Sequence, residues 1–260
     1  VNWSGHRFAF LVRVDVEHTE AQKYTGDPRS ERVALCTLLD AFDEIGTRQS
    51  FAVVGSTAEL YPDLIREIAA AHAVMGHSMF HEVPYQGMPQ ERQQRDVRRL
   101  RAAIEDACGR RIRGLACPFR GLADENTLKA SLDEGLEYVL SRLTVAQSKL
   151  PRLAGMEGYD RPILVPGGGA LTIGDWTDRR RDWPWNDDTF CSGTAVRRWM
   201  AAVDTAREEG RMCTLIVHPW MLHTNEHELQ VIKQVIAYAR ERGAWMPTYD
   251  ELADMVMGRA

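Results

Sequence analysis

The sequence predicts an α/β protein in which parallel strands are joined by crossover helices. Apolar runs typical of buried strands alternate with segments of helical spacing along most of the 260 residues. Apolar residues make up 44% and charged residues 27%, which is ordinary for a globular chain with one sizeable core. No linker divides the chain, so we expect one catalytic domain over residues 1–260. The alternation leaves a barrel and an open sheet both possible.

The order of the elements follows from local patterns. The run FAFLVRVDV is expected to be a buried first strand. The first long helix has apolar residues at helical spacing and ends at Gly46, and Gly109 and Gly243 close two later helices in the same way. Residues 148–192 hold many Pro, Gly and Trp residues and are expected to be rich in loops. The predicted strands are 8–16, 48–55, 73–78, 115–119, 138–141 and 213–217, and the predicted helices are 30–45, 57–72, 90–108, 125–134, 194–209 and 226–242.

Several function classes are disfavoured by the sequence. No GxGxxG follows the first strand, and Gly167–Gly169 lacks the lysine of a phosphate-binding loop. A net charge of −5 does not suit a nucleic-acid binder, and no apolar stretch reaches transmembrane length. The five cysteines contain no CxxC pair, which favours a reducing compartment, and we expect a cytoplasmic protein.

Chemistry-bearing residues follow three of the predicted strands directly. Asp15 and Glu17 end the first strand, His77 and His81 follow the third, and His218 follows the last apolar run. Because the carboxyl ends of parallel strands meet on one face, these side chains are expected to converge. On an ideal strand Asp15 and Glu17 point the same way, and on a helical turn His77 and His81 share a face.

Two imidazoles and a carboxylate form a ligand set that leaves one metal position open for water. Zinc is the metal that such a set favours, although cobalt, nickel or manganese would fit similar ligands. Either Asp15 or Glu17 could be the ligand, and the other acid would accept the water's proton. Ser78 is not placed in a G-x-S-x-G elbow, so we do not expect a serine nucleophile.

The same residues resemble the polysaccharide deacetylase family, also called the NodB or carbohydrate esterase family 4 type. The motifs come in the family's order, and the first is most similar to that of cytoplasmic allantoinase-like, imidase-like and sugar deformylase members. The resemblance implies a distorted (β/α)7 barrel that hydrolyses N-acyl groups. The matching segments are VDVE at 14–17, GHSMFH at 76–81, LACPFR at 115–120 and LIVHP at 215–219.

The resemblance also implies a role for each matching residue. Asp15 is the expected catalytic base and His218 the expected general acid. Glu17, His77 and His81 are expected to hold a divalent metal. Two departures concern Asp15: the family's usual second acid is Asp where this chain has Glu17, and its third motif carries an arginine where this chain has Ala116. Arg120 lies close in sequence and could replace that arginine, and His18 could intrude on the metal.

Substrate contacts are expected from the third motif and from a polar, aromatic loop. Aromatic faces suit sugar rings, and arginines suit phosphate or carboxylate groups. Alternatively, this loop caps the fold or forms a subunit contact without binding substrate. The expected substrate-binding residues are Ser78, Pro118, Phe119, Arg120, Asp175, Trp176, Trp183 and Trp185.

The function that the sequence favours is metal-dependent removal of an acetyl or formyl group from an amino sugar, with surface polysaccharide biosynthesis as a setting. One alternative is an allantoinase-like hydrolase of a cyclic amide or imide. Another is a degenerate barrel that only binds carbohydrate. A small-molecule or glycan substrate is expected, with no nucleic acid and no membrane insertion, while a homo-oligomer remains open.

Overall fold

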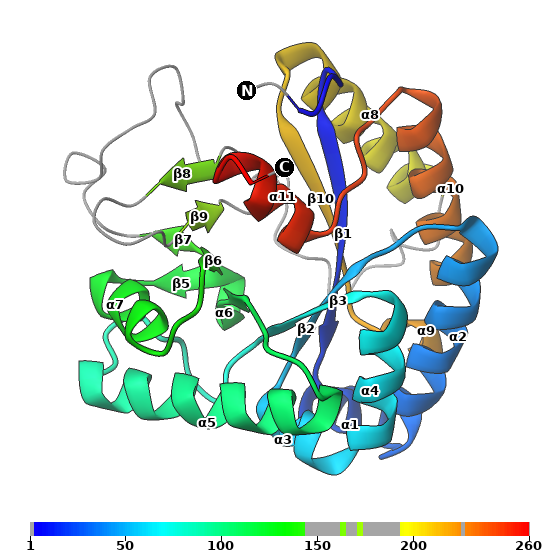
Figure 1. Ribbon diagram of the computed structural model, residues 1–260. Coiled ribbons are helices and arrows are strands. Elements are labelled where there is room, and N and C mark those ends of the chain that lie inside the picture. The colour runs from blue at the N-terminus through cyan, green and yellow to red at the C-terminus, as the bar shows by residue number, and fades with distance from the viewer. Residues whose placement is uncertain (1–2, 144–161, 165–170, 174–192, 225–226, 260) are drawn as a thin grey trace.

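The computed structural model describes residues 3–143, 162–164, 171–173, 193–224 and 227–259. Within these residues the strands form one large sheet and one two-stranded sheet. Figure 1 labels the elements in chain order. The strands are β1 (Ala9–Val16), β2 (Ser50–Val53), β3 (Ala73–Gly76), β4 (Gly114–Ala116), β5 (Leu122–Ala123), β6 (Tyr138–Leu140), β7 (Arg142–Leu143), β8 (Pro162–Leu164), β9 (Leu171–Ile173) and β10 (Met212–Val217).

Helices connect the strands and pack on the outer face of the sheet, except the last one, whose Tyr249 and Leu252 belong to the core of the inner face (Figure 1). The longest, α5, has a polar exposed face and a stripe of buried residues that includes Val97, Leu100 and Ile104. The helices are α1 (His18–Thr25), α2 (Ser30–Ile45), α3 (Gly55–Leu60), α4 (Pro62–Ala71), α5 (Gln90–Cys108), α6 (Pro118–Gly121), α7 (Glu125–Asp133), α8 (Gly193–Glu209), α9 (Met221–Thr224), α10 (Glu228–Glu241) and α11 (Tyr249–Val256).

The large sheet has the order β10-β1-β2-β3-β4-β6-β9-β8, and every described pairing from β10 to β9 is parallel. Only the outermost pair, β8 with β9, is antiparallel. The sheet curls with its helices outside, so the predicted distorted barrel of the NodB type is confirmed. The long helices between neighbouring parallel strands are the crossover connections that such a sheet requires.

The strand register determines which residues meet at the carboxyl edge. Val14 of β1 pairs with Val217 of β10, so the next residue of each strand, Asp15 and His218, lie level. On the other side Val16 pairs with Val53, and Val53 pairs with Gly76 of β3. The residues that follow Val16 and Gly76 are Glu17 and His77, which therefore emerge at the same level on either side of β2.

The two faces of β1 have different partners. Val12, Val14 and Val16 belong to the large core beneath the helices, whereas Ala9 and Leu11 belong to a smaller core inside the barrel. Since side chains alternate along a strand, the next inward positions are Arg13, Asp15 and Glu17. The barrel interior thus changes from apolar to charged toward the carboxyl end of β1.

One prediction of local structure was wrong. The single helix predicted over 57–72 is two helices, α3 and α4, which break at Tyr61 because a residue before proline is disfavoured in helical conformation. In the stretch 148–192, predicted to be rich in loops, the described residues are those of the short strands β8 and β9. In the described part of the chain, no helix has the length and apolar character needed to cross a bilayer.

Candidate active site

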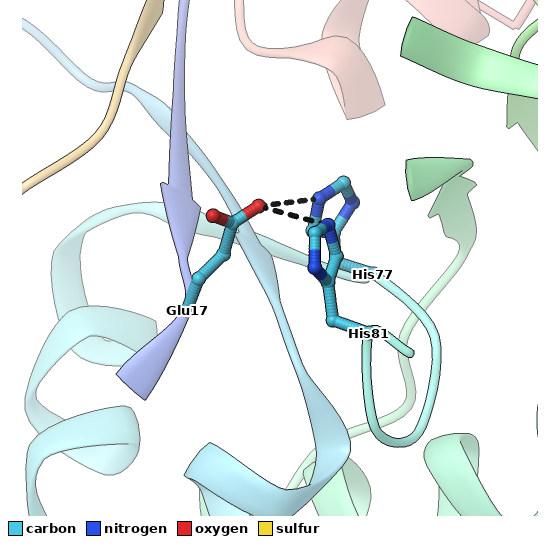
Figure 2. Close-up of side chains that lie close together, drawn as sticks. All are labelled: Glu17, His77 and His81. Carbon is cyan, nitrogen blue, oxygen red and sulfur yellow. Dashed lines mark hydrogen bonds and ion pairs between the residues drawn. The ribbon is translucent and has the colours of Figure 1, made fainter. Parts of the chain in front are cut away.

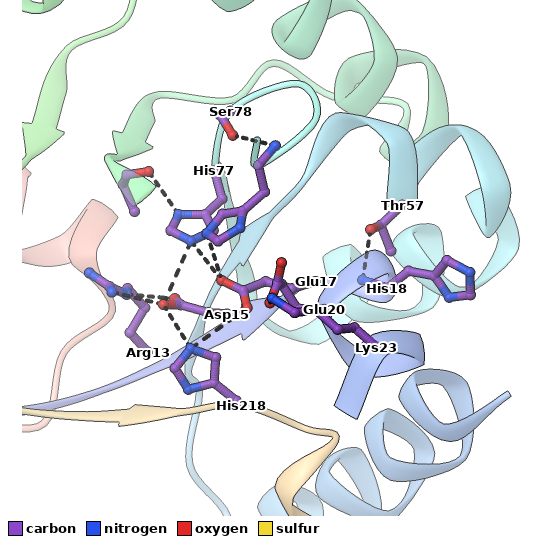
Figure 3. Close-up of polar contacts among 12 residues, drawn as sticks. Arg13, Asp15, Glu17, His18, Glu20, Lys23, Thr57, His77, Ser78 and His218 are labelled. Atoms are coloured by element: carbon purple, nitrogen blue, oxygen red, sulfur yellow. Dashed lines mark hydrogen bonds and ion pairs between the residues drawn. The ribbon is translucent and has the colours of Figure 1, made fainter. Parts of the chain in front are cut away.

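Five predicted residues gather where β1, β3 and β10 end (Figure 3). Asp15, Glu17 and His77 are almost fully buried, and the side chains of His81 and His218 are each 11% exposed. The nitrogen atoms of the three histidines lie 3.1 to 3.9 Å from carboxylate oxygens of the two acids, and Arg13 approaches Asp15 to 2.7 Å. The predicted convergence of the strand-end residues is present in the structure.

Glu17, His77 and His81 form the tightest group (Figure 2). The carboxylate oxygen Oε1 of Glu17 lies 3.1 Å from Nε2 of His77 and 3.2 Å from Nε2 of His81. Tetrahedral zinc with bonds of about 2.0–2.2 Å separates its ligand atoms by about 3.3–3.6 Å. The three atoms are therefore near the spacing that a bound cation needs, and their chemistry suits a divalent metal.

The tautomer of His77 also fits metal binding. Its Nδ1 lies 2.8 Å from the carbonyl oxygen of Ala116, which can only accept, so Nδ1 donates. Nε2 is thereby left as the atom that faces Glu17, in the arrangement commonly seen for metal-binding histidines. Burial alone would lower the pKa of His77, but the neighbouring Asp15 and Glu17 carboxylates outweigh burial and raise it.

His81 is held by its backbone and by an aromatic neighbour. Its backbone N–H donates to Oγ of Ser78 at 3.0 Å, and its ring stacks on Phe119 at a centroid distance of 4.6 Å. Burial lowers the pKa of His81, although the Glu17 carboxylate opposes this effect. A neutral imidazole is the form that binds a metal.

His77 and His81 do not lie on the helical turn that would place them on one face. Residues 77–81 form an irregular loop in which Ser78 and His81 have φ values of 65° and 53°. Phe119, which stacks on His81, also has a positive φ of 53°. Left-handed conformations at non-glycine residues carry a cost and concentrate at functional sites. The loop brings the two rings to a centroid distance of 5.2 Å without a helix.

Helix α5 fixes the same loop from outside the barrel. The carboxylate of Asp96 accepts the backbone N–H of Met79 at 3.1 Å and the hydroxyl of the buried Tyr85 at 2.5 Å. Met79 lies between the two histidines in sequence and is itself fully buried. The histidine loop is therefore anchored to a helix rather than supported by its own sequence alone.

Asp15 is held by an arginine that the sequence interpretation passed over. Nε and Nη2 of Arg13 donate to the two carboxylate oxygens of Asp15, at 2.7 and 2.9 Å. Burial would raise the pKa of Asp15, but Arg13 and the nearby His77 and His218 hold it at about 2. Asp15 is therefore a carboxylate at neutral pH. Arginine inside an apolar strand run, two residues before an acid, is the signal that could have found this pair.

Figure 3 shows His218 on the opposite side of the two acids from His77. The Nε2 atom of His218 is 3.9 Å from Oδ2 of Asp15 and 3.8 Å from Oε2 of Glu17. Burial would raise the pKa of Glu17, but His218, His77 and His81 together lower it. Asp15, Glu17 and His218 thus form a second group whose ligand atoms lie within 4.8 Å of one another.

Glu31, an acid that the sequence did not indicate, lies directly behind Glu17. Oε1 of Glu31, on α2, accepts the backbone N–H of Glu17 at 2.8 Å. Burial raises the pKa of Glu31 to about 8. No sequence motif marks Glu31, because its partner is a backbone group fourteen positions away.

The remaining predicted residues divide into three sets. Ser78 binds the loop backbone, Phe119 stacks on His81, and Pro118 begins the helix α6 beside them. Arg120 also lies on α6, but its side chain is outside the described part of the structure. Asp175, Trp176, Trp183 and Trp185 lie outside the described residues altogether.

His18 does not intrude on the site. Its ring packs edge-on against Tyr61 at a centroid distance of 5.2 Å, and its backbone N–H donates to Thr57. Figure 3 shows the ring turned away from Glu17. His223 and His227 are exposed, as expected for residues without a site role.

A parallel barrel with buried acids and histidines at its strand ends defines a class of barrel hydrolases. Residues 31–139 match the family model described as polysaccharide deacetylase. Residues 31–139 thus match this family, as the motifs of the chain predicted, and the family implies a hydrolase that acts on amide bonds.

Solved structures support the same fold. A protein from Mycobacterium smegmatis assigned to the polysaccharide deacetylases superposes with a TM-score of 0.77 and 21% identity, covering 98% of this chain and 92% of that one. The allantoinase PuuE superposes with a TM-score of 0.73 and 18% identity, covering 97% of this chain and 91% of that one. A family 4 acetyl xylan esterase from Clostridium thermocellum was solved with a cobalt ion. It superposes with a TM-score of 0.61 and 14% identity, covering 97% of this chain and 93% of that one. The sequence has no match among the curated proteins searched.

Proposed function

We propose that this protein is a metal-dependent hydrolase that removes an acetyl or formyl group from the nitrogen of an amino sugar. The observation that carries the proposal is the Glu17–His77–His81 group, with Asp15 and His218 beside it. Amide hydrolysis needs an activated water, a polarised carbonyl and a proton for the leaving amine. This constellation offers a residue for each need.

Each residue would have a distinct task. A divalent cation held by Glu17, His77 and His81 would supply a Lewis acid and lower the pKa of bound water. The Asp15 carboxylate, ionised at neutral pH, would accept the proton of the attacking water. His218, level with Asp15 on the neighbouring strand, would donate a proton to the departing amine.

Zinc is the proposed metal because two imidazoles and one carboxylate with an open position are its usual catalytic ligands. Cobalt, nickel and manganese bind similar sets. The cobalt ion in the related acetyl xylan esterase supports a divalent cation in this fold.

The assay compares N-acetylated and N-formylated amino sugars with purified protein carrying zinc or cobalt, and measures released acetate or formate. Release should need the metal and should fall below detection in His77→Ala, while the exposed His223→Ala serves as the control and keeps full activity. Absence of release from all such sugars with zinc, cobalt, nickel and manganese would exclude the proposal.

A cyclic amide is the second candidate substrate, and the likeness to an allantoinase favours it. The same preparations would be tested on allantoin and hydantoin. Ring opening without release from any sugar amide would replace the sugar proposal with this one. A protein that binds sugar but turns over neither class would instead be the carbohydrate-binding barrel.

A further inference from the structure

Arg13 is the least expected residue of the site, because its charge lies inside the barrel. Its side chain is 5% exposed and points inward from β1, in the row that continues from Leu11. Burial of a guanidinium costs several kcal/mol unless a partner compensates it. The two hydrogen bonds to Asp15, at 2.7 and 2.9 Å, provide a fork-shaped pairing of the strong kind.

The strand makes this pair rigid. Arg13 and Asp15 are two residues apart on β1, which is paired on both sides, with β10 and with β2. Their side chains therefore leave the same face of a fixed backbone. Both oxygens of Asp15 are engaged by Arg13 (Figure 3), so the carboxylate plane is set by the arginine.

The neighbouring strands leave space for a long side chain in this layer. Arg13 pairs in register with Ser50, and Asp15 pairs with Ala52, both of which are small and buried. Ala116 of β4, at the level of His77, is also fully buried in the inner core. An arginine at position 116 would have to share this interior with Arg13, which is consistent with alanine there.

Arg13 also affects where a cation can bind. Two groups could hold one, and both include Glu17: the first adds His77 and His81, and the second adds Asp15 and His218. A guanidinium bound to both oxygens of Asp15 places a positive charge against the second group and uses its acceptors. Repulsion between like charges at short range in a buried site is strong. Both of these guanidinium hydrogen bonds go to Asp15, a member of the second group. The ligand atoms of Glu17, His77 and His81 approach at 3.1 and 3.2 Å, against 3.8 and 3.9 Å from His218 to the two acids, so the first group is the better cation site.

Resting on the proposed function, we propose that Arg13 is a positioning residue with two effects: it fixes the Asp15 carboxylate for proton acceptance, and it confines the cation to Glu17, His77 and His81. Asp15 is then reserved as a base instead of a ligand. The contact between Arg13 and Asp15 thus gives the two acids of the first strand, Asp15 and Glu17, different tasks.

The first test measures metal binding. Arg13→Met and Arg13→Lys are compared with a control, Arg113→Met. Arg113 forms ion pairs with Glu137 and Asp254 and lies just before β4, at the end of that strand away from the site. Calorimetric titration with cobalt, together with its visible spectrum, should give one ion per chain for the wild type, Arg113→Met and Arg13→Lys. Arg13→Met should bind a second ion, and Asp15→Asn combined with Arg13→Met should lose it.

The second test measures turnover. Loss of orientation of a reacting group commonly lowers rate by about 100-fold. Arg13→Met should therefore lower kcat by about 100-fold with KM within about threefold, and Arg13→Lys should recover part of kcat, while Arg113→Met keeps the wild-type kcat. In the Asp15→Asn background, Arg13→Met should have little further effect, because the arginine acts through Asp15.

The outcomes separate this inference from the proposed function. A folded Arg13→Met variant with wild-type kcat and one cobalt ion would overturn the role of Arg13. If Arg13→Met fails to fold, Arg13→Lys takes over: a kcat about tenfold below wild type supports the role, and an unchanged kcat overturns it. Absence of amide hydrolysis by the wild type would defeat only the proposed function, because cobalt stoichiometry still decides whether Arg13 confines the cation.

Discussion

At the scale of single residues, Glu17 replaces the shorter acid that the family's first motif usually carries. Its longer side chain places Oε1 near both His77 and His81 while Oε2 faces His218 at 3.8 Å. One carboxylate therefore joins the proposed metal ligands to the proposed acid. Glu31 fixes the backbone of Glu17 from behind, at 2.8 Å, and limits its movement.

Replacement of Glu17 by glutamine tests the ligand role directly. Gln keeps the shape but removes the charge, so zinc affinity should fall by more than the 10–100-fold that outer partners usually contribute. Glu67→Gln, at an exposed position of α4, is the matched control and should keep wild-type affinity. Competition with a chromophoric chelator gives both values. Equal affinities in the two variants would remove Glu17 from the ligand set.

At the scale of elements, the sequence predicted regular structure better than loop conformation. Helices 30–45 and 90–108 match α2 and α5 at both ends, because Gly46 and Gly109 stop them with φ near 70°. The loop that carries His81 is not the helical turn on which the two histidines would share a face, since Ser78 and His81 themselves adopt positive φ. Nothing in the spacing of two histidines reveals that conformation, which tertiary contacts enforce.

The anchor of that loop on α5 gives a second prediction. Asp96→Ala removes the acceptor for Met79 and Tyr85, both buried, and leaves polar groups unsatisfied at a cost of about 1–3 kcal/mol each. Chemical denaturation should show this loss, and zinc affinity should fall because His77 and His81 are less ordered. Asp106→Ala on the exposed face of the same helix is the control. Unchanged zinc affinity in a destabilised Asp96→Ala protein would show that the anchor serves folding alone.

At the scale of the whole molecule, the topology explains why the site was predictable in part. Parallel strands bring their carboxyl ends together wherever they lie in sequence, so the residues that follow β1, β3 and β10 could be assigned in advance. Arg13 was passed over: its place two residues before Asp15 suggests a pair, but an arginine within an apolar run does not by itself reveal whether its head is buried or solvated. Contacts such as Glu31 with the backbone of Glu17 depend on how helices pack on the sheet, which no local pattern encodes.

The stability of the whole chain should depend on pH through Glu228, at the start of α10. Burial raises its pKa from the ordinary 4.5 to about 7, so between these values the folded state binds more protons than the unfolded state. Stability contributed by this group is therefore full below pH 4.5 and is lost as pH rises through 7, a change of about 3 kcal/mol.

Glutamine at this position does not titrate. The Tm of Glu228→Gln minus that of the wild type should therefore be several degrees higher at pH 8 than at pH 5. The size follows because 1 kcal/mol corresponds to about 2–4 °C in a chain of this size. Calorimetry across this range measures the difference, with the exposed Glu241→Gln at the other end of α10 as the control. A difference in Tm that stays constant from pH 5 to pH 8 would mean that Glu228 keeps its charge in the folded protein, and that its surroundings stabilise the carboxylate despite its burial.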